Sequence, residues 1–554
     1  MQQIKAAFAQ IKTTFQTNLA QRPSSSFMTL YIGIMLTIFP LFLKDYTDIT
    51  LKKFLFVTAV TAAMVFILIA FPDRAAQDQL IHPQPKKWDL VLILFFVYFG
   101  VCVLSVISSP YFKLDWDAVV QLLMGYGRYD GIIVFVLLSA IFLAACKYGR
   151  LRVWHLVGMS IAMIIMAVIS IVQLCGYNVF DFYSTGQTVL HFASFIGTAG
   201  NVDINASLLC LLVPLCAAGY IFLRPRAFLS WLFLIGTAGC LYVMLQTGVS
   251  AGRLGLVAAA LVFIPIILSS KMLLYRGLDI FITFFVAYFF KASLRHSWDP
   301  APKTEFTFTT AAAVCLIIIG LLLAAKLVLW AWFSRQDKTQ IHYHKKVMLC
   351  VFIVELVLVI AAAVYLRWGY TVSKNDTLLD EIARFFKGEL DIWSGSHRIA
   401  MWQSAWLIFE KYPVLGSGYG SFRIAFDDIA SPTYQSMIGR VTTVDFAHND
   451  YLHILCSTGV LGLSSYLAFL GAAAVRAGKA MFHNPKVPVL CCALVCYLAQ
   501  IFFSFPIVIV SPLFWLILGM LCYEAKNTIK HDKNSCGSGL NYAIMTTKRM
   551  QKNF

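Results

Sequence analysis

The sequence predicts an all-α membrane protein that crosses the bilayer many times. The chain of 554 residues is 60% hydrophobic and only 13% charged, whereas soluble domains carry about 25% charged residues. Apolar runs of roughly 17–25 residues recur between Met28 and Cys522, each long enough to cross about 30 Å of hydrocarbon. Because lipid offers no partner to backbone N–H and C=O groups, these spans must be helices.

Hydropathy and flanking charge predict about 12–14 membrane-spanning helices, and fourteen candidate spans can be delimited. The first, fourth and eighth spans are short, and the division of the last two depends on Pro506 in FFSFPIVIVSP. The expected spans are 28–43, 54–71, 88–107, 131–146, 153–174, 204–223, 228–245, 254–269, 272–290, 308–330, 347–366, 451–474, 487–504 and 506–523.

These spans divide the chain into five segments. Apolar residues from Ile4 to Leu19 recur at helical spacing, which indicates an amphipathic helix on the membrane surface, with a partly disordered tail as the alternative. The segments are a cytoplasmic amphipathic N-terminal segment (1–27), a transmembrane bundle (28–366), a large extracytoplasmic loop with an amphipathic helix (367–450), C-terminal transmembrane helices (451–523) and a basic cytoplasmic tail (524–554).

The distribution of Lys and Arg predicts the orientation. With the N-terminus inside, the inner segments hold about 26 Lys and Arg residues and the short outer loops roughly 9, as the positive-inside rule expects. Both termini are then cytoplasmic in a plasma membrane. The net charge of +17 is explained by basic inner loops that face anionic lipid, so it calls for no nucleic-acid partner.

The fourteen cysteines do not indicate a metal site. Most lie inside the expected spans, where cysteine behaves as a small apolar residue. The chain has no pair of cysteines with zinc-binding spacing outside the spans. We therefore expect neither a metal nor another cofactor.

The outer loop over 367–450 is too long to be a simple connection. Ile399, Trp402, Trp406 and Phe409 fall on one helical face, and tryptophans on such a face suit a membrane interface. The stretch KYPVLGSGYGSF then ends the helix with proline and three glycines. The loop is either part of a functional site or a lid that covers the bundle.

A second outer loop, over 175–203, contains no Lys or Arg and ends in GTAGNVDINAS. Asn201, Asp203 and Asn205 stand where a helix begins, so helix capping is the simplest interpretation. Lining of a polar outer cavity is the alternative.

Two ionisable residues fall deep within expected spans. Lys326 is nine residues before Arg335, and Glu355 is nine residues after Lys346, so both lie roughly 13 Å from the inner basic loop. Buried intramembrane charges usually pair, which predicts a structural Lys326–Glu355 ion pair. A proton-coupled transporter or flippase would use the same two residues.

His448 and Asn449 form a polar pair where the long outer loop enters an apolar helix, followed by Gly459 and Gly462. A histidine of ordinary pKa is neutral at pH 7 and can accept a hydroxyl proton, and Asn449 can orient it or bind the acceptor. The two glycines allow close packing against a neighbour. The simpler interpretation of His448 is a satisfied polar residue at a helix end.

Two arginines also fall on the outer side. Arg253, in SAGRLGLV, runs against the positive-inside bias, and Arg398 lies near the start of the loop helix. A guanidinium group binds phosphate oxygens in bidentate fashion, and a helix N-terminus favours an anion. An anchoring role for Arg253 and a solvated surface position for Arg398 are the alternatives.

Together these residues resemble the O-antigen ligase and O-antigen polymerase family of bacterial polysaccharide enzymes. The resemblance rests on His448-Asn449 with Gly459 and Gly462, the long loop before them with RIAMWQSAWLIFEKYPVLGSGYGSF, and the GTAGN and SAGRLGLV segments. The family pattern ends in a further glycine, where this chain has Leu463.

The resemblance implies a glycosyltransferase-C-like helical membrane enzyme that needs no metal. Such an enzyme moves a glycan from an undecaprenyl-pyrophosphate carrier to a glycan, lipid or protein acceptor in cell-envelope biosynthesis. Carried over by position, Arg253 and Arg398 look like pyrophosphate-binding residues, and His448 looks like the base for the acceptor hydroxyl. The reaction would be one in-line displacement at the anomeric carbon, with inversion. A polysaccharide polymerase of the same family is the alternative activity.

Overall fold

The computed structural model describes residues 22–73, 89–113, 115–178, 181–182, 195–223, 225–297, 303–333, 341–373, 378–390, 392, 394–439 and 442–536. The amphipathic helix expected within 1–27 and most of the expected basic tail lie outside these ranges.

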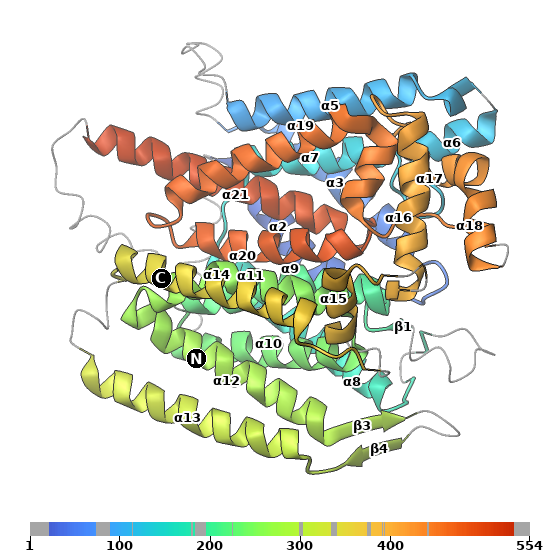
Figure 1. Ribbon diagram of the computed structural model, residues 1–554. Coiled ribbons are helices and arrows are strands. Elements are labelled where there is room, and N and C mark those ends of the chain that lie inside the picture. Colours follow the sequence, from blue (N-terminus) through green and yellow to red (C-terminus); the bar gives the residue numbers. More distant parts are fainter. Residues whose placement is uncertain are drawn as a thin grey trace.

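The described chain is almost entirely helical, which confirms the predicted all-α membrane fold (Figure 1). The long helices are α2 (Pro23–Leu41), α3 (Ile49–Ala70), α5 (Leu90–Ile107), α7 (Ile132–Tyr148), α8 (Val153–Leu174), α9 (Val202–Leu223), α10 (Ala227–Thr247), α11 (Ser250–Leu268), α12 (Lys271–Ser293), α13 (Thr310–Trp332), α14 (Lys345–Trp368), α19 (Asp450–Ala480), α20 (Lys486–Gln500) and α21 (Ser511–Cys536). Each corresponds to one of the fourteen expected spans.

Twelve of the described helices are long and apolar enough to cross a membrane, so the chain is a multi-pass membrane protein. Helix α7, of 17 residues, is shorter and packs along α21. The break expected at Pro506 is present, since a short 3₁₀ turn, η4 (Ile501–Phe503), and an irregular segment separate α20 from α21. The residues over 501–510 connect these two helices.

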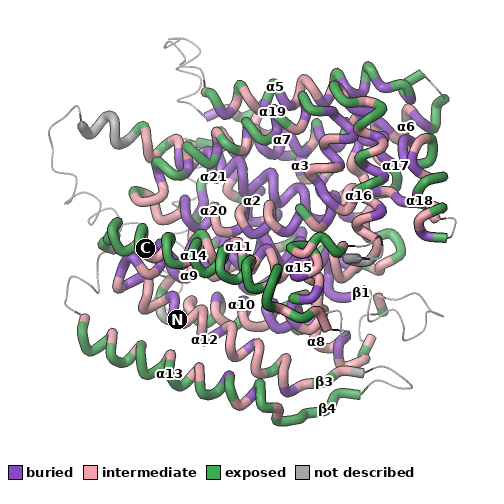
Figure 2. Tube along the Cα trace, in the orientation of Figure 1, coloured by how far each residue is buried: buried purple, intermediate pink, exposed green. Residues whose placement is uncertain are grey.

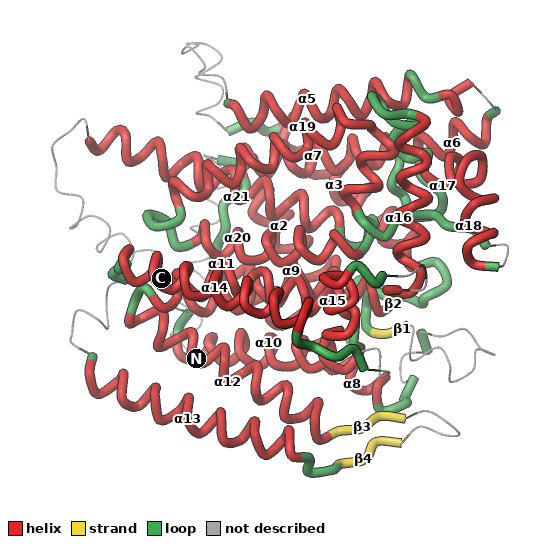
Figure 3. Tube along the Cα trace, viewed as in Figure 1, coloured by secondary structure: helices red, strands yellow, loops and turns green. Residues whose placement is uncertain are grey.

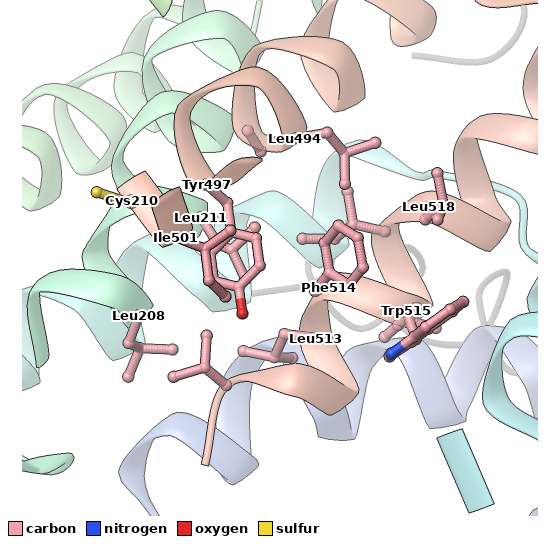
Figure 4. Close-up of a cluster of buried hydrophobic side chains, with 14 of the residues drawn as sticks. Leu208, Cys210, Leu211, Leu494, Tyr497, Ile501, Leu513, Phe514, Trp515 and Leu518 are labelled. Carbon is pink, nitrogen blue, oxygen red and sulfur yellow. The ribbon is translucent and has the colours of Figure 1, made fainter. Parts of the chain in front are cut away.

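The core of the bundle lies between α9, α20 and α21 (Figure 4). Leucine and aromatic side chains from these helices interdigitate there, and Tyr497 and Phe514 pack ring to ring with centroids 5.1 Å apart. The labelled members of this cluster are Leu208, Cys210, Leu211, Leu494, Tyr497, Ile501, Leu513, Phe514, Trp515 and Leu518. This packing fixes α9 and the end of α20, which lead into the segments beside the candidate site.

Helices α13 and α14 lie at the edge of the bundle and expose most of their apolar side chains (Figure 2). They are consecutive in sequence, but α13 packs against α12 whereas α14 packs against α11. Apolar side chains on such a surface suit contact with lipid.

The predicted Lys326–Glu355 ion pair is wrong for this reason. Lys326 on α13 pairs with Asp279 on α12, which also accepts a hydrogen bond of 2.5 Å from the Tyr220 hydroxyl. The Lys326 ammonium lies 4.5 Å from the centre of the Tyr275 ring. A carboxylate oxygen of Glu355 is buried and has no hydrogen-bond partner among the described residues. Lys326 and Glu355 therefore do not pair with each other.

The elements outside the bundle gather at one end of it, on the right in Figure 3, together with two short hairpins. The helices there are α6 (Trp116–Met124), α15 (Leu378–Lys387), α16 (Ser394–Lys411), α17 (Phe422–Ala425), the π-turn η3 (Phe426–Ala430) and α18 (Ser431–Ile438). The hairpins are β1 (Phe195–Ile196) with β2 (Gly200–Asn201) and β3 (Leu294–Ser297) with β4 (Lys303–Phe306), both antiparallel. The candidate site residues Arg253, Arg398 and His448 all lie at this end.

Candidate functional site

His448 stands immediately before α19, in a segment over 442–449 that is neither helix nor strand. Its φ is +50°, a left-handed conformation that costs a residue other than glycine about 1–3 kcal/mol. Asn449 is the N-cap of α19, since its side-chain oxygen accepts a hydrogen bond of 3.1 Å from the Leu452 backbone N–H. Asn449 therefore caps the helix, and His448 precedes the cap in a strained backbone conformation.

Gly459 breaks α19 with φ +67° and ψ −172°. The turn that follows α16 docks onto this break: Val460 N–H donates to Pro413 O at 2.9 Å, and Gly418 N–H donates to Ser457 O at 2.9 Å. A Cβ atom on Gly459 would lie 2.1 Å from Val414 O. The close neighbour of Gly459 is thus a turn of the outer loop rather than another helix.

The break also bears on Gly462, because the three atoms nearest to a Cβ atom there all belong to Thr458 of the same helix. The loop over 367–450 is in this way hydrogen-bonded to the helix that follows His448. It is part of the structure around the motif and not a separate cover.

The segment between α20 and α21 forms one wall beside His448. The imidazole ring meets the Phe505 ring edge to face, with centroids 4.9 Å apart. Phe505 also stacks on Phe446, two residues before His448, at 5.0 Å. The histidine is therefore held among aromatic rings contributed by two separate parts of the chain.

Arg128, which the motif analysis missed, lies against the same rings. Its Nε and Nη2 atoms are each 2.9 Å from Asp445 Oδ2. The guanidinium carbon is 5.3 Å from the centre of the Phe505 ring and 5.8 Å from that of Phe446. The signal available in the sequence was the GYGRYDG stretch, an arginine among turn residues in an outer loop.

Two further ionisable side chains lie behind this layer. His453 packs between Phe422 and Phe446, with ring centroids 5.0 and 5.1 Å away, and its Nε2 is 4.0 Å from Asp130 Oδ2. Burial raises the pKa of Asp130 to about 7, and the nearby Asp445 adds to the rise while Arg128 opposes it. Asp130 is therefore a carboxyl group that changes charge near neutral pH.

The surroundings of His448 hold its imidazole in the neutral form. Burial lowers the pKa of His448 to about 4, and the positive charges of Arg398 and Arg128 lower it further, while Asp445 opposes them. A neutral imidazole has one ring nitrogen with a free lone pair, which can accept a proton. The imidazole is therefore neutral at pH 7 and has a lone pair available, although its low pKa makes it a weaker proton acceptor than an ordinary histidine.

Arg398 lies one turn into α16, the predicted loop helix, and its charge acts on His448. Its Nε atom is buried and has no hydrogen-bond partner among the described residues. The buried face of α16 carries Ala400, Ser404 and Ile408.

The predicted aromatic face of α16 packs differently along its length. Trp402 lies against Phe502 and Phe503, with centroids 6.0 and 6.1 Å away, whereas Trp406 is 48% exposed. Arg398 is one helical turn from Trp402. The helix therefore meets the segment that also carries Phe505.

Arg253 lies in the first turn of α11, at the same end of the bundle. One of its terminal nitrogens donates a long hydrogen bond of 3.4 Å to Leu245 O. Its Nε atom, like that of Arg398, is buried and without a hydrogen-bond partner in the described structure. A buried N–H group without an acceptor is costly, by about 1–3 kcal/mol, and calls for an explanation.

A small apolar cluster connects the two arginines. It contains Ala206, Val249 and Ala251, with Val202 and Phe503 packed against it. Phe503 contacts Trp402, one turn from Arg398, and Ala251 is two residues before Arg253. Phe505 contacts His448, so the short segment over 503–505 contacts His448 itself and residues near Arg253 and Arg398.

The start of α9 completes this region. Asn201 Oδ1 accepts hydrogen bonds from Asp203 N–H at 2.8 Å and Ile204 N–H at 3.4 Å, so Asn201 caps the helix as expected. Asp203, in the first turn, lies close enough to Arg398 for their charges to interact. Among the residues that the structure describes, no cluster of three His, Cys, Asp or Glu side chains could hold a metal ion.

Comparison with known families identifies part of this architecture. Residues 306–467 match the model of a family described as O-antigen ligase. The match runs from β4 into α19 and includes Arg398, His448 and Asn449, whereas Arg253 and Arg128 precede it. Among proteins of curated function, no match to the chain is found. The predicted resemblance to the O-antigen ligase family is confirmed.

Proposed function

We propose that this membrane protein of the O-antigen ligase family transfers a glycan from an undecaprenyl-pyrophosphate carrier to an acceptor hydroxyl outside the plasma membrane. The family match supports a glycosyltransferase-type enzyme in general. The donor, the acceptor and the assignment of Arg253, Arg398 and His448 are parts of the proposal.

The proposal rests on a buried hydrogen-bond donor in each of the two arginines that the described residues leave unsatisfied. Each presents a buried Nε–H group that has no acceptor among the described residues, and both lie at the end of the bundle where His448 is found. Guanidinium groups match phosphate oxygens in geometry and charge. A bound pyrophosphate would supply the missing acceptors, which explains why two such costly groups occur there.

The proposed reaction is a single displacement at the anomeric carbon of the donor sugar. His448 takes the proton of the acceptor hydroxyl as its oxygen forms a bond to that carbon. The bond from the carbon to the pyrophosphate oxygen breaks, and the pyrophosphate leaves on its polyprenyl carrier with the bonding electrons. Arg253 and Arg398 stabilise the negative charge that develops on it, the kind of preorganised electrostatics that contributes strongly to catalysis.

The donor role of the arginines is tested with purified protein in lipid nanodiscs and a carrier-linked glycan. We expect Arg253→Gln and Arg398→Gln to weaken donor binding by more than about tenfold, since a charge-assisted hydrogen bond contributes about 1.5–3 kcal/mol. Arg367→Gln is the matched control, because Arg367 is an exposed arginine at the outer end of α14. Unchanged donor affinity in both site variants would remove the pyrophosphate role.

The base role of His448 and the acceptor class are tested by mass analysis of products. His448→Ala should bind donor normally and lose transfer, by about 10²–10⁴-fold for a lost general base. Offering lipid-linked, peptide and carrier-linked acceptors separates a ligase, which would glycosylate the first two, from a polymerase, which would extend the third. Transfer by His448→Ala at the wild-type rate would contradict the proposed mechanism.

A further inference from the structure

We infer that Arg128 is a positioning residue, which holds His448 in its reactive place through the ion pair with Asp445 and the aromatic pair Phe446 and Phe505. This inference rests on the proposed function of His448. Arg128 belongs to the loop between α6 and α7, more than three hundred residues from His448 in sequence.

The contacts make a connected support for the histidine. Arg128 binds one carboxylate oxygen of Asp445 through two nitrogens, each at 2.9 Å, and its guanidinium group lies over both aromatic rings. Asp445 and Phe446 precede His448 by three and two residues, and Phe505 touches the imidazole ring itself. Arg128 therefore fixes both the chain before His448 and the ring beside it.

Such support is needed because His448 lies in a segment without regular secondary structure. The segment over 442–448 is neither helix nor strand, and His448 has a φ of +50°. A strained residue persists only where the surrounding structure over-determines it. The helix cap at Asn449 fixes one side of His448, and the Arg128–Asp445 pair fixes the other.

The same pair sets the electrostatics of the imidazole. The charged groups that act on His448 are Arg398 on α16, Asp445 in its own segment and Arg128 in the loop between α6 and α7. Asp130, on the same loop, faces His453. Arg128 and Asp445 oppose each other in their effect on His448, so removing either one alone leaves the charge of the other uncompensated.

The test measures transfer kinetics of Arg128→Gln, Asp445→Asn and the double variant. We expect each single variant to lower kcat about 10- to 100-fold, because a misplacement of about 1 Å can cost a hundredfold in rate, while the KM for the donor changes less than about twofold. The double variant should be no slower than the slower single variant, since both residues belong to one interaction.

The pH profile separates positioning from a general loss of stability. Arg128→Gln removes a positive charge, so the pKa of His448 should rise and the acid limb of the rate profile should move to higher pH. Asp445→Asn removes a negative charge, so that limb should move to lower pH. A role in folding alone would produce no shifts of opposite sign.

Arg423→Gln is the matched control. Arg423 also makes an ion pair, with Nε 2.8 Å from Asp427 Oδ2 four residues along the chain, and its guanidinium group lies 5.0 Å from the centre of the Tyr126 ring rather than over Phe446 and Phe505. We expect it to retain wild-type kinetics.

The outcomes distinguish this inference from the proposed function. If His448→Ala is inactive while Arg128→Gln and Asp445→Asn behave like Arg423→Gln, the positioning role is wrong and the base role stands. If Arg128→Gln instead raises the donor KM more than about tenfold at unchanged kcat, Arg128 contacts substrate directly, and the inference is overturned. Normal transfer by His448→Ala would remove the premise of both.

Discussion

At the scale of single residues, the candidate site contains groups whose conformation or burial costs free energy. His448 has a left-handed backbone conformation, and Arg253 and Arg398 each bury an Nε–H group that finds no acceptor within the described part of the chain. Local strain and unsatisfied groups concentrate where function requires them. The sequence predicts all three on the same side of the membrane, and the elements that carry them lie at one end of the bundle.

The pH dependence of the wild-type enzyme follows from the environment of His448. Its pKa is lowered to about 4, so the imidazole is neutral at pH 7 and is able to accept a proton. We expect the transfer rate to be level from neutral pH downward and to fall only as pH approaches that value, because protonation removes the lone pair. An acid limb centred near the ordinary histidine pKa of about 6.5 would contradict this environment. The measurement is kcat against pH in nanodiscs.

At the scale of elements, the turn over 413–418 and the break at Gly459 depend on each other. The turn supplies hydrogen bonds to α19 where the helix lacks its own, and glycine alone tolerates both the positive φ and the close approach of Val414 O. The glycine motif therefore joins the outer loop to the helix that begins beside His448.

Replacement of Gly459 by alanine should destabilise the protein by more than about 2 kcal/mol, through backbone strain and the collision with Val414. Gly471 lies in the same helix with no atom near the position of a Cβ, so Gly471→Ala is the matched control and should have no such effect. Thermal unfolding in detergent measures both. Equal melting temperatures for the two variants would show that the turn does not depend on the break.

The intramembrane charges give a second prediction about elements. Lys326 and Asp279 are partly buried and join α13 to α12, so removal of one partner should cost less than the about 3–5 kcal/mol of a fully buried pair. We expect Lys326→Met to lower the melting temperature, and the double variant with Asp279→Leu to recover much of the loss. Glu355→Gln, at a residue outside this pair, serves as the comparison. A larger loss for Glu355→Gln than for Lys326→Met would contradict the observed pairing.

At the scale of the whole molecule, the two ends of the bundle differ. The short helices α15 to α18 and both hairpins gather at one end with the candidate site. The excess of Lys and Arg in the opposite loops predicts that this end is outside. An extracytoplasmic site fits a donor presented on a lipid carrier.

Cysteine labelling of intact cells tests this orientation. Lys303→Cys in β4 and Lys345→Cys at the start of α14 both replace exposed residues at opposite ends of the bundle. An impermeant maleimide should label the cysteine at 303 and not that at 345, above the background of the native cysteines. The reverse pattern would place the candidate site on the cytoplasmic side and contradict the proposed donor.

The sequence determined the fold class and the approximate positions of the fourteen long helices, because span length and hydropathy are properties of short stretches of chain. The cap at Asn201 and the helix over the RIAMWQSAW stretch could be predicted for the same reason. Only the tertiary structure decided which helices touch. Lys326 pairs with Asp279 because α13 packs on α12 and not on its successor, and Arg128 reaches Asp445 across more than three hundred residues. Such contacts depend on packing between distant segments, which no local pattern records.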